Sequence, residues 1–82
     1  MHYYLAKDKK TKKVHLIEAN SSEKAREALQ GLIGFPNGIE WVIHENSPSK
    51  LMGRFGVHLT ESYWADKFNQ GNIQDVTKMM EI

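Results

Sequence analysis

A run of six polar residues at positions 8–13 separates two short stretches, residues 2–7 and 14–19, that are rich in aromatic and aliphatic side chains. Patterns of this kind favour strands. So short a connection joins only antiparallel neighbours, because a parallel pair needs a crossover of a dozen or more residues. The chain is therefore expected to begin with a β-hairpin.

A helix signal follows this hairpin. Asn20 precedes Glu23 by three residues, which is the spacing of a capping box, and residues 21–32 place apolar side chains at helical spacing. We expect Asn20 to cap this helix and either Gly31 or Gly34 to supply its left-handed C-terminal cap. The expected apolar stripe consists of Ala25, Ala28, Leu29 and Leu32.

The middle of the chain predicts two further strands. As strands, residues 39–45 and 51–58 would each place most of their large apolar side chains on one face, and a turn-forming segment, 35–38 or 46–50, precedes each of them. This arrangement is typical of strands with one buried and one exposed face.

The C-terminal part of the chain predicts two helices. Thr60 can cap a helix over residues 61–70 that Gly71 ends, and Asn72 can cap a short helix that runs to the chain end. The apolar stripe of the short helix would consist of Ile73, Val76 and Met80.

Together these elements, in the order β-β-α-β-β-α-α, predict an α+β fold. A chain of 82 residues suits one domain, residues 1–82, with a four-stranded, mostly antiparallel sheet and helices packed on one face. Trp41 and Phe55 would then be buried against the first helix, because both lie on the apolar faces of their strands.

The composition is that of a globular protein, with 40% hydrophobic and 26% charged residues and no cysteine. A small secreted domain usually needs disulfides to compensate for a thin core, so the lack of cysteine favours a cytoplasmic protein. The sequence has no apolar run of roughly 18 residues and no signal-like start, and we therefore expect no membrane association.

Positive charge is concentrated at the predicted hairpin tip. The first 13 residues carry a net charge of +4, whereas the rest, with six basic and nine acidic side chains, carry −3. This tip could meet nucleic-acid phosphates or an acidic protein surface. It could equally keep the hairpin soluble and discourage edge-to-edge pairing. The lysines concerned are Lys7, Lys9, Lys10, Lys12 and Lys13.

The predicted sheet also offers a second candidate surface. A sheet covered by helices on one side leaves its other face open. An open face with tyrosine, histidine and arginine side chains could bind nucleotides, as RNA-binding sheets do, or could be an ordinary solvent-exposed face. Its expected members are Tyr4, Glu40, His44, Arg54 and His58.

The predicted helix over residues 61–70 carries a third candidate. Trp64 and Phe68 share one stripe at helical spacing and are expected in the core. Tyr63 points about 100° away from Trp64, so one of the two should be partly exposed. An exposed aromatic side chain on a helix could anchor an interface.

Residues for metal binding and catalysis do not form a known pattern. The four histidines lack a short metal spacing, and cysteine ligands are missing. The sequence has no phosphate-binding glycine loop, no G-x-S-x-G motif and no H-E-x-x-H motif. We therefore expect no metal, no cofactor and no enzymatic activity.

Four segments of the first half of the chain form one architectural plan. Tyr3-Tyr4-Leu5 opens a strand, residues 14–19 close the hairpin, residues 24–28 form an alanine-bearing helix, and residues 39–45 return as a strand. This plan resembles that of small phage and mobile-element proteins, the anti-CRISPR inhibitors among them. The resemblance implies stoichiometric binding to a host nucleoprotein machine without catalysis, and it assigns no individual site residue.

We therefore expect a small non-catalytic binding module whose partner is a protein or a nucleoprotein complex, engaged through the lysine-rich tip and a neighbouring surface. The alternative is a module that binds nucleic acid directly through the same lysines and the open sheet face. A third possibility is a subunit that dimerises through an edge strand or the C-terminal helices.

Overall fold

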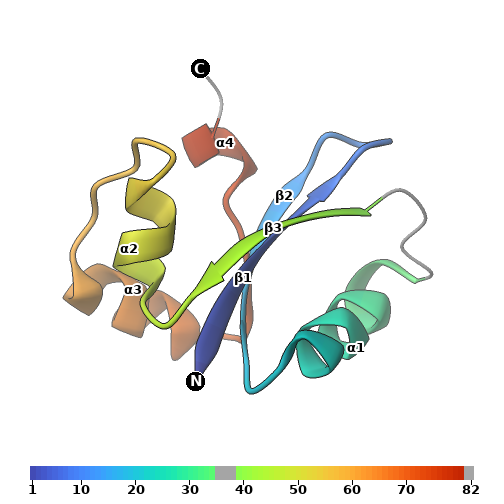
Figure 1. Ribbon diagram of the computed structural model, residues 1–82, viewed down its shortest axis with the longest axis horizontal. Coiled ribbons are helices and arrows are strands. Elements are labelled where there is room, and N and C mark those ends of the chain that lie inside the picture. The colour runs from blue at the N-terminus through green and yellow to red at the C-terminus, as the bar shows by residue number, and fades with distance from the viewer. Residues whose placement is uncertain (35–38, 81–82) are drawn as a thin grey trace.

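The computed structural model describes residues 1–34 and 39–80, except for the side chains of residues 33, 39 and 41–43. The turn expected at 35–38 therefore lies outside the described residues. Within them the fold is α+β, with one four-stranded sheet (Figure 1). The strands are β1 (His2–Asp8), β2 (Val14–Ala19), β3 (Ile39–Glu45) and β4 (Ile73–Asp75).

The predicted N-terminal hairpin is confirmed. Strands β1 and β2 pair antiparallel with Leu5 opposite Leu16, and β3 pairs antiparallel with the other edge of β1. Strand β4 adds to the free edge of β2, again antiparallel, which gives the order β3-β1-β2-β4. The hairpin thus forms the centre of the sheet.

Helix α1 (Ser22–Ile33) begins within two residues of Asn20, but its cap is Ser21. The Ser21 hydroxyl accepts the N–H of Lys24 at 3.2 Å, so the prediction that Asn20 caps the helix is wrong by one residue. Gly34, with a φ of 79°, provides the predicted C-terminal cap, since glycine adopts this left-handed backbone without steric cost.

The strand expected over 51–58 is wrong. Helix α2 (Pro48–Gly53) begins inside the expected turn, where Ser47 accepts the N–H of Lys50 at 3.3 Å and Pro48 occupies the first helical turn. Proline suits that position because its missing N–H has no partner there in any helix. Gly56, with a φ of 83°, lies in the turn after the helix.

The C-terminal elements are confirmed in part. Thr60 caps helix α3 (Glu61–Phe68) as expected, although this helix ends before Gly71. The expected start of a helix at Asn72 is wrong, because residues 73–75 form β4 and only α4 (Thr77–Met80) is helical. The fourth strand of the sheet therefore comes from the C-terminal part of the chain.

Helices cover both faces of the sheet, which corrects the expectation of one covered face (Figure 1). On one face, Leu5 and Leu16 pack with buried side chains of α2 and α3, including Leu51 and Trp64. The other face packs against α1, and this cluster consists of Tyr4, Ala6, Ile17, Ala19, Ala25 and Leu29. Successive residues of β1 are buried on opposite faces, and the fold has three layers.

Two expected core residues lie elsewhere. Phe55 is 39% exposed in the turn after α2, and Leu32 of α1 is 55% exposed, so neither belongs to the core. The side chain of Trp41 lies outside the described residues. None of the described helices combines the length and apolar character that crossing a membrane requires.

Candidate binding site at the lysine hairpin

The loop between β1 and β2 has a defined backbone. The Asp8 carboxylate accepts the N–H of Lys10 at 2.9 Å, and the Asp8 carbonyl accepts the N–H of Lys12 at 2.8 Å. The N–H of Asp8 itself donates to the carbonyl of Lys13 at 2.9 Å. These bonds close the loop, and the N–H of Lys10 lowers the pKa of Asp8 by stabilising its charged form.

Lys12 adopts a left-handed backbone with a φ of 64°, the only such residue besides glycine in the described part of the chain. A side chain in this conformation costs on the order of 1 kcal/mol, so the surrounding hydrogen bonds must hold it. The backbone from which the loop lysines project is therefore fixed.

We call the surface formed by the five lysines of this region the lysine hairpin. All five side chains are exposed: Lys7, Lys9, Lys10, Lys12 and Lys13. Neither ion pair found among the described residues, Lys24–Glu27 or Arg54–Glu45, includes any of them. Their positive field is thus available to a partner.

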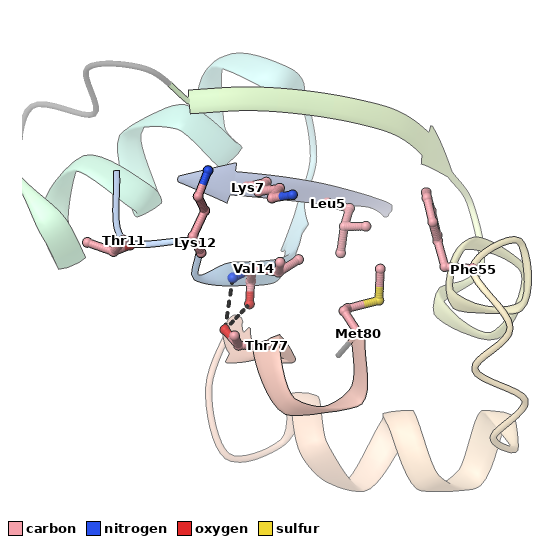
Figure 2. A pocket seen from close by; sticks show the side chains of 8 residues that line it. All are labelled: Leu5, Lys7, Thr11, Lys12, Val14, Phe55, Thr77 and Met80. Carbon is pink, nitrogen blue, oxygen red and sulfur yellow. Dashed lines mark hydrogen bonds between the residues drawn. The ribbon is translucent and has the colours of Figure 1, made fainter. Parts of the chain in front are cut away.

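A groove of about 460 Å³ lies beside the lysine hairpin (Figure 2). We call it the hairpin groove. Its apolar lining is formed by Leu5, Val14, Phe55 and Met80. Its polar lining is formed by Lys7, Thr11, Lys12 and Thr77. The groove thus combines two lysines of the predicted binding tip with residues such as Phe55 and Met80, which the sequence did not indicate as binding residues.

Thr77 fixes the wall that α4 contributes to the hairpin groove. Its hydroxyl oxygen accepts the N–H of Val14 at 2.9 Å (Figure 2). The N–H of Val76 donates to the carbonyl of Val14 at 2.9 Å. The Thr77 hydroxyl donates to Asp75 at 2.5 Å, and this bond lowers the pKa of that carboxyl. Met80 is therefore anchored one turn later against the groove.

The described residues do not bring the second candidate surface together as one face. Tyr4 is buried in the core against α1, where its ring stacks on that of exposed His44 at a centroid distance of 5.3 Å. Arg54 and His58 lie after α2 in the connection to α3, and Arg54 pairs with Glu45. The expected sheet face fails because both faces are covered and because residues 51–58 form no strand.

Glu40 is the member of that set that lies closest to the lysine hairpin by register. It is exposed on β3, directly opposite Lys7 on β1. Side chains at opposed positions of paired strands lie on the same face of the sheet. A carboxylate therefore accompanies the first lysine at the rim of the groove.

Tyr63 is half-buried on α3. Its ring packs edge-on against Trp64 at a centroid distance of 5.1 Å, and the ammonium group of Lys67 lies 5.6 Å from its centre. Trp64 is completely buried, so Tyr63 is the more exposed of the two. It packs against the edge of the core and does not line the hairpin groove.

A separate ionisable pair spans β2 and β4. His15 is buried and lies opposite Asp75 in the strand register. Burial lowers the pKa of His15, and the negative charge of Asp75 partly opposes this effect. Within residues 1–34 and 39–80 the structure contains no cluster of three or more histidine, aspartate or glutamate side chains that could hold a metal.

Comparison of the chain with protein-family models, with curated protein sequences and with solved structures found no match.

Proposed function

We propose that this chain is a small non-catalytic binding module that docks on an anionic surface of a protein or nucleoprotein complex through its lysine hairpin. One observation carries the proposal: five exposed lysines, unpaired within the described residues, project from the end of β1 and from the adjoining loop, whose backbone is fixed by Asp8. Such a concentrated field speeds encounter with an anionic partner.

The sequence supports three parts of the proposal: the cellular location, the kind of partner and the lack of catalysis. The lack of cysteine supports a cytoplasmic location. The resemblance to anti-CRISPR inhibitors would make the partner a host nucleoprotein complex and the module an inhibitor. The absence of a known catalytic motif supports binding without chemistry.

Direct binding to nucleic acid is the less favoured function. In the part of the chain that the structure describes, no open sheet face is left for the expected stacking platform, because α1 covers one face and α2 and α3 cover the other. Lysines alone would contact phosphates, which position a nucleic acid without reading its bases.

A charge-reversal experiment tests the proposal. The variant carries Lys9→Glu, Lys10→Glu and Lys12→Glu. The matched control carries Lys24→Glu, Lys50→Glu and Lys67→Glu, which change the net charge equally but lie on α1, α2 and α3. Partners are captured on each protein from a bacterial lysate, with and without nuclease treatment, and identified by mass spectrometry at low and high salt. Circular dichroism checks that both variants fold.

We expect the wild type and the control to retain the same partner at low salt and the hairpin variant to lose it. Salt should weaken the interaction, because the Debye length falls from about 10 Å at 0.1 M to about 3 Å at 1 M. Equal capture by all three proteins would refute the proposal. Loss of the partner on nuclease treatment alone would favour direct nucleic-acid binding.

A further inference from the structure

The hairpin groove places an apolar surface next to positive charge. Leu5 and Val14 are buried at its base, whereas Phe55 is 39% exposed and Met80 is half-buried. Figure 2 shows Lys12 and Thr11 on the hairpin side of the groove and Phe55 on the opposite side, with Met80 between them.

The exposure of Phe55 results from a fixed turn. Its N–H donates to the carbonyl of Met52 at 3.0 Å, and the N–H of Val57 donates to the same carbonyl at 3.0 Å. Gly56 allows this turn through its left-handed backbone. The aromatic ring is therefore held at the groove by the backbone of the α2 turn.

This combination of groups matches a particular kind of ligand. An apolar side chain would remove the exposed surface of Phe55 and Met80 from water, while carboxylates beside it would meet the ammonium groups of Lys7 and Lys12. A nucleic acid fits less well, because among the described residues the groove offers a single partly exposed ring and no arginine.

We propose that the hairpin groove binds an acidic peptide segment of the partner and takes one of its apolar side chains between Phe55 and Met80. This inference rests on the proposed function, since it names the chemistry of the surface that the lysine hairpin recognises. The lysines provide attraction over a distance, and the groove provides the contact that slows dissociation.

Three synthetic probes test the inference on the whole chain. The first is a peptide of alternating glutamate and aspartate with one central Leu-Phe pair, the second has Ser-Ser in place of that pair, and the third is a thymidine oligonucleotide. Binding is measured by fluorescence anisotropy, and the contact surface is mapped by NMR shifts of amides and methionine methyl groups. The groove variant is Phe55→Ser, and the control is Leu32→Ser, another exposed apolar side chain, which lies on α1 outside the groove.

We expect the Leu-Phe peptide to bind about five- to tenfold more tightly than the Ser-Ser peptide, which corresponds to partial burial of an apolar side chain. Phe55→Ser should remove this difference, and Leu32→Ser should preserve it. The NMR signal of the Met80 methyl group should shift on addition of the Leu-Phe peptide but not on addition of the Ser-Ser peptide or the oligonucleotide. Lys12→Glu should weaken the binding of both peptides.

The outcomes separate this inference from the proposed function. Equal binding of the two peptides, with dependence on Lys12 retained, overturns the groove inference and leaves the lysine hairpin as the binding surface. Tighter binding of the oligonucleotide than of either peptide also overturns it. The inference also fails if no probe shifts the NMR signals of the groove residues. If Lys12→Glu leaves the affinity of every probe unchanged, both the inference and the proposed function fail.

Discussion

The backbone N–H of Val14 donates a hydrogen bond to the hydroxyl oxygen of Thr77 at 2.9 Å, and this bond joins residues 63 positions apart. Together with the bond from the N–H of Val76 to the carbonyl of Val14, it continues the pairing of β2 and β4 beyond Asp75. The start of α4, and with it one wall of the hairpin groove, is thereby attached to the hairpin.

Replacement of Thr77 by valine should destabilise the protein by about 1–3 kcal/mol, because the N–H of buried Val14 would lose its acceptor. Thr77→Ser keeps the hydroxyl and should cost much less. Urea denaturation of the two variants measures the difference. Equal stability of the valine and serine variants would show that the hydroxyl oxygen contributes nothing to this attachment.

The cap of α1 provides a second test, because two adjacent residues compete for the role. Ser21→Ala should lower the free energy of unfolding by about 0.5–2 kcal/mol, since the N–H of Lys24 would lose its acceptor. Asn20→Ala at the exposed preceding position should have a smaller effect. A larger loss with Asn20→Ala, measured by thermal unfolding, would restore the capping role predicted from the sequence.

The cap of α1 shows that local sequence signals determine the helix boundaries to within about one residue. Ser21, Thr60 and Gly34 lie within one residue of where the sequence predicts helix boundaries, because caps depend on a few neighbouring residues. The hairpin is predicted for the same reason, since a short polar loop between two strand-like stretches permits little else.

Longer-range features were not predictable in this way. Three-residue β4 is too short to show a period, and it forms because β2 offers it a free edge. The error at residues 51–58 has a different cause, because a local helix start at Ser47-Pro48 stands directly before apolar residues whose spacing resembles that of a strand. The hairpin groove was missed because Leu5, Phe55 and Met80 come together only in the folded chain.

Titration of Tyr3 should lower the free energy of unfolding in alkaline solution. Burial, and after it the hydrogen bond that the Tyr3 hydroxyl donates to the Glu18 carboxylate at 2.7 Å, together raise the pKa of Tyr3 to about 12. The folded state therefore retains a proton that the unfolded state releases near pH 10, so the contribution of Tyr3 is complete below about pH 10 and is lost as the pH rises towards about 12.

The measurement compares urea midpoints of the wild type and Tyr3→Phe between about pH 9 and about pH 12, the range over which tyrosine titrates here. The wild type should lose more stability over this range than Tyr3→Phe, although the variant starts lower because it lacks the hydrogen bond to Glu18. Tyr63→Phe, at a half-buried position on α3, controls for the general effect of losing a tyrosine hydroxyl. Parallel pH profiles for the wild type and Tyr3→Phe would contradict the prediction.

Glu40 should oppose the binding of an anionic partner, although the sequence places it among candidate binding residues. It is exposed and stands opposite Lys7 in the pairing of β3 with β1. Its carboxylate therefore reduces the positive field at the rim of the hairpin groove. Two charges about 6 Å apart in a watery environment interact by on the order of 0.7 kcal/mol, which is roughly threefold in affinity.

Glu40→Gln keeps the size of the side chain and removes its charge. It should strengthen binding of the acidic Leu-Phe peptide by about two- to fivefold at low salt, and the gain should shrink as salt screens the field. Glu27→Gln on α1 removes an equal charge far along the chain from the lysine hairpin and should change the affinity less. Anisotropy titrations at several salt concentrations measure both variants. Weaker binding of Glu40→Gln would instead make Glu40 a direct contact for the partner, and the acidic peptide would then be the wrong model of what the groove binds.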